Sequence, residues 1–265
     1  MSILAYALRD SATMLRRNLL RMRRYPVLTF TVAAVPVVLL LLFVYVFGDT
    51  LGAGLGGASG NRADYLTYVA PGIFLLAVAG STQGTAILVA MDMKEGIIAR
   101  FRTMAIARAS VLTGHVVGSM IQTLLGLAIV VGVALLVGLR PSATPAEWVA
   151  AAGLLVIVIL ALTWLSVALG LVAKTVEGAS NLPMPLLLLP FLGSGFVPTE
   201  GMPVGLRWFA EYQPFTPIIE TLRGLLFGTP IGNSGIIAVA WCAAITLAGY
   251  LWAKKLYSRD PTVRP

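Results

Sequence analysis

Few residues in this 265-residue chain are of types that could catalyse a reaction or bind a metal ion. The chain has one histidine, His115, and one cysteine, Cys242, so it cannot form a paired-histidine zinc site or an internal disulfide. Lys174 and Thr175 follow an alanine, and no glycine-rich loop precedes them, so the phosphate-binding pattern of an ATPase is missing. The sequence therefore predicts no catalytic residue, no metal site and no cofactor bound by the chain itself. His115 is expected to form a hydrogen bond near the end of a membrane helix.

Small, weakly polar side chains are of more interest, because they lie within long apolar stretches. Our candidates for lining a substrate path are Ser81, Gln83, Gln122 and Thr163. The alternative is that they only form hydrogen bonds between closely packed helices. No Asp, Glu, Lys or Arg falls in the interior of these stretches. This disfavours transport driven by an ion gradient, because such transporters usually keep a charge near the middle of the membrane.

The composition indicates that membrane-spanning helices position these residues. Hydrophobic residues make up 58% of the chain and charged residues 11%, and the mean hydropathy is +0.90. A soluble domain has about 25% charged residues. The apolar stretches long enough to cross a bilayer are residues 27–47, 68–91, 114–137, 148–173, 182–197 and 235–253. We therefore predict an all-α integral membrane protein with six transmembrane helices.

Lysine and arginine are distributed unequally between the two sides of this arrangement. Of the 19, fifteen lie on the side that holds both termini and four on the other. The positive-inside rule then predicts a multi-pass protein of the cell's inner (plasma) membrane with both termini in the cytoplasm. Topology also accounts for the net charge of +8, and the sequence has no element that would bind nucleic acid.

Two segments are amphipathic and too charged to cross a membrane. Residues 1–26 place leucines on one helix face and arginines on the other, which predicts a cytoplasmic interfacial helix. Residues 202–227 predict a re-entrant external segment between the fifth and sixth spans. Its charged candidates are Glu211, Glu220 and Arg223, of which the last two are spaced to pair on one face. Residues 254–265 are expected to form a cytoplasmic tail.

The fifth apolar stretch is interrupted by residues that break helices. Prolines stand at 183, 185, 190 and 198, and Gly193 and Gly195 flank Ser194. Such a sequence would leave backbone groups without hydrogen bonds in lipid. We therefore predict a broken helix that is shielded by protein or by water.

Two parts of the sequence resemble motifs of a known family. The first comprises Met202-Pro203, Leu206-Arg207-Trp208-Phe209-Ala210, Gln213-Pro214-Phe215-Thr216-Pro217 and Thr221-Leu222-Arg223-Gly224, and the second is the predicted cytoplasmic segment 92–104. Both resemble ABC-2 type transporter permeases, and in particular the daunorubicin/doxorubicin-resistance subfamily. The chain departs from the family at Ala105-Ile106-Ala107, where a proline is common, and at Gln213, where the wider superfamily often has Asn.

The resemblance implies that residues 27–253 form an ABC-2 type transmembrane domain that dimerises and docks a separate cytoplasmic ABC ATPase. That partner would use ATP and Mg. The residues implied in docking are Arg16, Arg17, Lys94, Glu95, Arg100, Phe101 and Arg102. The alternative for these residues is ordinary positive-inside charge. The implied function is export of an amphipathic drug, antibiotic or lipid-like compound. A glycan or lipid-linked sugar is the alternative cargo, and a gradient-driven secondary transporter is the alternative mechanism.

Overall fold

The computed structural model describes residues 26–54, 62–95 and 108–258, and within these ranges it consists of helices and turns. The elements in chain order are α2 (Pro26–Leu42), a π-helical turn (Phe43–Phe47), α3 (Gly48–Gly54), α4 (Arg62–Lys94), α6 (Arg108–Val137), α7 (Pro145–Val172), α8 (Val176–Asn181), α9 (Met184–Leu188), a 3-10 turn (Thr199–Gly201), α10 (Val204–Tyr212), α11 (Phe215–Phe227) and α12 (Ser234–Ser258). The all-α class is thus confirmed for the part of the chain that the structure describes.

Five helical segments in these ranges are long and apolar enough to cross a membrane. They are Val32–Ala53, Arg62–Lys94, Leu112–Val137, Pro145–Val172 and Ser234–Tyr257. Each coincides with one of the predicted spans, so those five helices are confirmed. The last helix continues to Ser258, which places Lys254 and Lys255 in its final turns although we predicted them to lie in a terminal tail.

The remaining predicted span, the fifth in chain order (residues 182–197), is not one continuous helix. It contains the single-turn helix α9, and residues 189–196 are turns. We refer to residues 182–197 as the broken segment. It runs antiparallel to α4, because Ser180, just before it, contacts Gln83, and Gly195, near its end, packs on Gly72. Those two positions of α4 are eleven residues, or about 16 Å, apart along the helix axis. The broken segment therefore lies alongside a membrane-length helix for much of its length.

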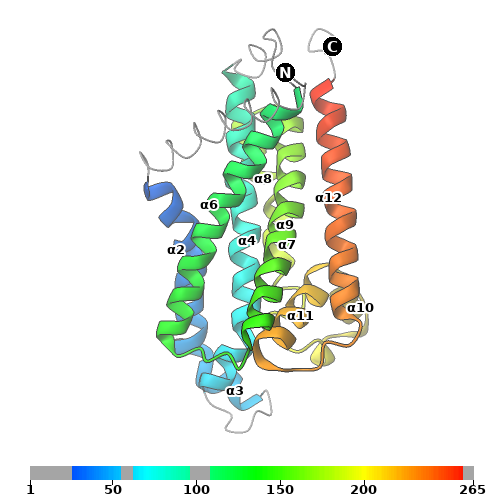
Figure 1. Cartoon of the computed structure of the whole chain (residues 1–265). Coiled ribbons are helices and arrows are strands. Elements are labelled where there is room, and N and C mark those ends of the chain that lie inside the picture. Colours follow the sequence, from blue (N-terminus) through cyan, green and yellow to red (C-terminus); the bar gives the residue numbers. More distant parts are fainter. Residues whose placement is uncertain (1–25, 55–61, 96–107, 259–265) are drawn as a thin grey trace.

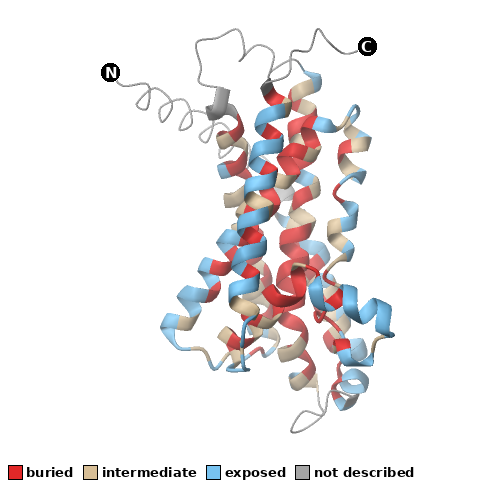
Figure 2. Cartoon of the chain, turned by 90° about the vertical axis from the view of Figure 1, so that its right-hand side faces the viewer, coloured by how far each residue is buried: buried red, intermediate tan, exposed pale blue. Residues whose placement is uncertain are grey.

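Helix α4 forms the centre of the bundle, in contact with α2, α6, α7, α8 and α11. Its residues 69–79 are all buried, and Figure 2 shows the buried residues gathered along the inside of the bundle. The outer helices α2, α6 and α12 instead carry exposed apolar side chains, such as Phe30, Leu136 and Ile236. Apolar surface of this extent on three long helices is typical of contact with lipid.

Local sequence explains how α7 begins. Pro145 occupies the first turn, where its missing N–H costs nothing. The Thr144 hydroxyl accepts a hydrogen bond from the Glu147 N–H, and the Glu147 carboxylate accepts one from the Thr144 N–H at 2.6 Å. This reciprocal capping box fixes the start of the helix after the short connection from α6.

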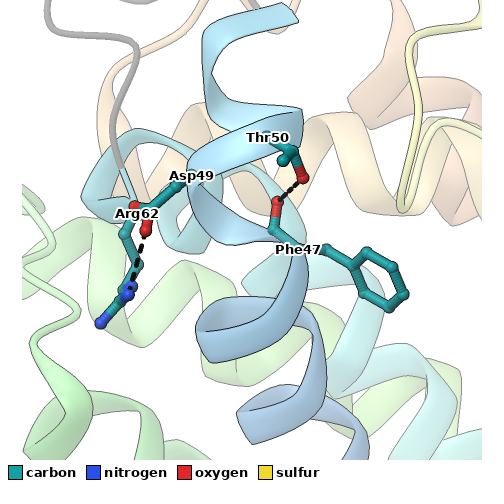
Figure 3. Close-up of polar contacts among 4 residues, drawn as sticks. All are labelled: Phe47, Asp49, Thr50 and Arg62. Atoms are coloured by element: carbon teal, nitrogen blue, oxygen red, sulfur yellow. Dashed lines mark hydrogen bonds and ion pairs between the residues drawn. The ribbon is translucent and has the colours of Figure 1, made fainter.

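The two ends of the bundle differ in character. The start of α2 and the end of α12 lie in one half of the bundle, and α3, α10 and α11 lie in the other (Figure 1). In that second half Arg62 forms an ion pair of 3.1 Å with Asp49, and the Thr50 hydroxyl donates to the Phe47 carbonyl (Figure 3). The contact between Arg62 and Asp49 joins α3 to the start of α4.

Candidate functional site

The central helix α4 opens to the surface partway along its length. After the buried run that ends at Ala79, Gly80 and Ser81 are half-buried and Gly84 is exposed. A Cβ atom at Gly84 would meet no atom within 4 Å. The Ser81 hydroxyl donates to the Val78 carbonyl at 2.7 Å, so it is satisfied within its own helix. Residues 80–84 therefore form a small, polar strip, which we call the α4 strip, in an otherwise apolar bundle.

Gln83 connects the α4 strip to the start of the broken segment. Its Nε2 donates to the Ser180 carbonyl at 3.0 Å and to the Ser180 hydroxyl at 2.8 Å. Ser180 belongs to α8, whose first turn is capped by the Thr175 hydroxyl accepting from the Gly178 N–H at 3.0 Å. Hydrogen bonds from the Glu177 backbone N–H and the Thr175 hydroxyl lower the pKa of the Glu177 carboxyl, which is consistent with a well-formed helix start.

The other two candidates for the substrate path lie on different helices. Thr163 is buried in α7, and Gln122 is half-buried in α6. Neither forms a hydrogen bond with Ser81 or Gln83. The structure thus brings Gln83 together with Ser180, a residue that our sequence analysis missed. Its position three residues before Pro183, the first proline of the broken segment, was the available signal.

Side chains of α10 and α11 satisfy the backbone of the broken segment. The Gln213 Nε2 donates to the Leu189 carbonyl at 3.0 Å, and the Thr216 hydroxyl accepts from the Ser194 N–H at 3.3 Å. The same Thr216 hydroxyl donates to the Ala210 carbonyl. Because protein groups replace the missing helical hydrogen bonds, the prediction of a broken helix shielded by protein is confirmed at these positions.

Arg223 completes this arrangement, although not with the partner that we predicted. Its Nη2 donates to the Ser194 carbonyl at 2.8 Å and to the Tyr68 carbonyl at 3.1 Å. Its guanidinium carbon lies 4.0 Å from the centroid of the Tyr68 ring. Glu220 instead accepts a hydrogen bond of 2.7 Å from the Ser234 hydroxyl of α12. The predicted ion pair between Glu220 and Arg223 is therefore wrong, because both side chains have partners on neighbouring elements.

Glycines allow the broken segment to approach α4 closely. A Cβ atom at Gly72 would lie 2.6 Å from the Gly195 carbonyl oxygen, and one at Gly193 would lie 2.3 Å from the Gln213 Nε2. The stacked rings of Phe191 and Phe196, with centroids 4.4 Å apart, pack beside this contact. Glycines thus permit close contact between backbones where prolines and glycines exclude regular helix.

Helix α10 carries the remaining charged candidate. Glu211 accepts a hydrogen bond of 2.7 Å from Arg207, one turn earlier, and both side chains are exposed. Trp208 and Tyr212 are also exposed on this helix, at 66% and 65%. The helix therefore presents aromatic and paired charged side chains in the half of the bundle opposite the start of α2 and the end of α12 (Figure 1).

The other end of α4 holds the described part of the predicted docking surface. Lys94 and Glu95 are exposed there, whereas Arg16, Arg17, Arg100, Phe101 and Arg102 lie outside the described residues. Just before Lys94, Asp92 is buried and its Oδ2 lies 3.1 Å from the Nε2 of His115 on α6. His115 thus contacts a carboxylate, and no group of three potential metal ligands occurs among the described residues.

Comparison with known proteins assigns this architecture to a family. The sequence model of the family described as "ABC-2 type transporter" matches residues 10–227, which is most of the chain. The chain belongs to the ABC-2 type transporter family. The match includes α4, the broken segment, α10 and α11, so the α4 strip and the contacts of Arg223 are parts of an ABC-2 transporter domain.

Individual relatives of this ABC-2 transporter chain are drug-resistance permeases. The daunorubicin resistance ABC transporter permease protein DrrB1 of Streptomyces coeruleorubidus is 28% identical over 226 residues, which cover 85% of this chain and 77% of the relative. The probable doxorubicin resistance ABC transporter permease protein DrrC from two strains of Mycobacterium tuberculosis is 30% identical, with 79% of this chain and 75% of the relative covered. The resemblance predicted from the sequence motifs is thereby confirmed.

Proposed function

We propose that this chain is the permease subunit of an ATP-driven exporter that moves an amphipathic drug, antibiotic or lipid-like compound out of the cell. The observation that carries the proposal is the similarity of more than three quarters of the chain to permeases named for resistance to daunorubicin and doxorubicin. On this proposal a separate ABC ATPase binds ATP and Mg, and two permease chains form the working dimer. The permease itself binds no nucleotide.

The architecture supports a path beside α4. The α4 strip offers small and polar groups within an apolar bundle, and the broken segment lies next to it. On this proposal the broken segment is the fifth of six crossings. Small residues leave room for a ligand, and amphipathic compounds are held mainly by apolar surface with few polar contacts. Conformational change at the broken segment would expose Ser81 and Gln83 alternately to the two sides of the membrane.

The distribution of charge supports the proposed orientation. The helices α4, α7 and α12 all end at the same end of the bundle (Figure 1). Lys94 is the last residue of α4, Lys174 follows α7, and Lys254 and Lys255 lie in the final turns of α12. We place that end in the cytoplasm of a plasma-membrane protein. The α10–α11 pair then forms the re-entrant external segment. The ATPase would dock on residues 1–26 and on the connection from α4 to α6, which contains Arg100, Phe101 and Arg102.

Reconstitution tests this proposal directly. The permease would be co-purified with its proposed partner ATPase, placed in liposomes and supplied with ATP and Mg, and movement of daunorubicin would be followed by its fluorescence. We expect transport that vanadate abolishes and that an uncoupler leaves unchanged. Transport that stops with the uncoupler and continues in vanadate would contradict ATP-driven export. Transport of a lipid-linked sugar in place of daunorubicin would contradict the proposed cargo class.

A further inference from the structure

Arg223 joins three elements at the end of the bundle where α10 and α11 lie. The residue belongs to α11, its guanidinium contacts the backbone and ring of Tyr68 on α4, and it binds the Ser194 carbonyl of the broken segment. Gln213 and Thr216 also hold the broken segment, but within the described part of the chain their side chains connect it only to the α10–α11 pair. Among these three side chains, Arg223 is the one that also reaches α4.

The charge of Arg223 is held in an unusual way. No carboxylate of the described residues lies within ion-pairing distance of the guanidinium, because Glu220 faces Ser234. Cations removed from water are usually paired with an anion. Here two carbonyl oxygens and an aromatic face take that role, and the buried Nε has no partner among the described residues. Releasing the guanidinium would leave no buried anion unpaired, so this contact can break at lower cost than a buried salt bridge.

At the level of Ser194 the broken segment meets α4 through glycine residues. Gly193 and Gly195 flank Ser194, and Gly72 of α4 faces Gly195 without a side chain on either residue. Two glycine backbones in contact do not interlock as side chains do. The position of the broken segment on α4 therefore depends strongly on the hydrogen bonds that Arg223 donates.

We propose that Arg223 is a latch that closes the external end of the substrate path. In the closed state it holds the broken segment and α11 against Tyr68 of α4, and its release from Ser194 and Tyr68 allows the segment to move away when substrate exits. Arg223 acts through the segment that it holds, so it is a positioning residue. This inference rests on the proposed export function, but its first test does not require transport.

The rate at which a thiol reagent labels position 194 reports whether the latch is released. Ser194 is 4% exposed and its hydroxyl has no hydrogen-bond partner among the described residues, so Ser194→Cys introduces a thiol without removing a bond. Cys242, the chain's one natural thiol, would be replaced by alanine. The complex of permease and ATPase would be placed in nanodiscs, where a charged maleimide reaches both faces. In this parent protein, which carries Ser194→Cys and Cys242→Ala, we expect the thiol to be labelled slowly.

Arg223→Met should raise the labelling rate by about tenfold or more. A tenfold change in an opening equilibrium corresponds to about 1.4 kcal/mol, which the loss of two charge-assisted hydrogen bonds exceeds. ATP-driven export in liposomes should fall by a similar factor while ATP hydrolysis continues. The matched control is Arg207→Met, because Arg207 is exposed and bonds only Glu211 on its own helix. This control should change neither labelling nor export.

The outcomes separate the latch from the proposed function. Unchanged labelling in Arg223→Met overturns the latch even when the parent exports, and so does faster labelling with full export. If Arg223→Met cannot be recovered folded, Arg223→Gln decides in the same way, because glutamine keeps a donor but loses the charge. A parent that exports nothing with ATP would instead contradict the proposed function, whatever the labelling shows.

Discussion

Adding one methyl group at Gly72 should destabilise the protein by separating α4 from the broken segment. In Gly72→Ala the new Cβ would lie 2.6 Å from the carbonyl oxygen and 2.9 Å from the Cα of Gly195. Both are backbone atoms, so the clash cannot be relieved by rotating a side chain. We expect the segment around Ser194 to move away from α4, which would weaken the hydrogen bonds of Arg223.

The expected magnitude follows from two opposing effects. Replacing glycine by alanine within a helix contributes about 1 kcal/mol of stability. Overpacking of a close contact costs about 1–3 kcal/mol. Gly153→Ala in α7 provides the matched control, since its Cβ would meet no atom within 4 Å and only the helix-forming effect applies. Gly72→Ala should therefore be less stable than Gly153→Ala by about 1–3 kcal/mol, which corresponds to roughly 2–12 °C in melting temperature for a chain of this size.

The buried thiol of Cys242 allows the melting temperatures of these variants to be measured without a further label. Cys242 is 1% exposed, so a dye that becomes fluorescent on reaction with thiols reports unfolding as the detergent-solubilised protein is heated. The Gly153→Ala protein should melt at or above the temperature of the unaltered protein, and the Gly72→Ala protein below it. Equal melting temperatures for the two variants would refute the close contact between Gly72 and Gly195.

Three other predictions concern the opposite end of the bundle. Asp92→Ala and His115→Ala should each destabilise the protein in the same melting assay. The double variant should lose less stability than the sum of the two single losses, with a coupling energy of about 0.5–3 kcal/mol. Additive losses would show that the buried contact of 3.1 Å between Asp92 and His115 contributes nothing to stability. Reversing the charge of Arg100 and Arg102 together should weaken co-purification of the ATPase and abolish export, while the protein still inserts in the membrane. Normal export with the ATPase still bound would exclude the connection from α4 to α6 as a docking site. A cysteine placed at Lys94 should resist an impermeant thiol reagent on intact cells, and labelling there from outside would reverse the topology that we propose.

The local sequence was sufficient to predict five of the membrane-length helices. Long apolar stretches can satisfy their backbone groups in lipid only as helices, so composition and length determine them with little help from tertiary contacts. The ends were less well predicted. Helix α12 continues to Ser258 through Lys254 and Lys255, because a helix can extend beyond the apolar stretch once its side chains reach water.

The partners of polar side chains could not be predicted from spacing. Glu220 and Arg223 are three residues apart, a spacing that permits a pair on an isolated helix. In the folded protein Arg223 reaches Tyr68, 155 residues away in sequence, and Glu220 reaches Ser234 on the next helix. Spacing describes only what one helix could do alone, whereas burial against several elements offers competing partners.

The sequence by itself determined that this chain is a helical membrane protein of the ABC-2 family, and that its fifth apolar stretch must break. Hydrophobic length and the backbone chemistry of proline and glycine act locally, so they can be read without a fold. Only the tertiary structure decided which groups satisfy the broken backbone, and that Gly72 faces Gly195. Those contacts join residues from 22 to more than 120 positions apart, and their geometry depends on how α4, α10 and α11 pack together.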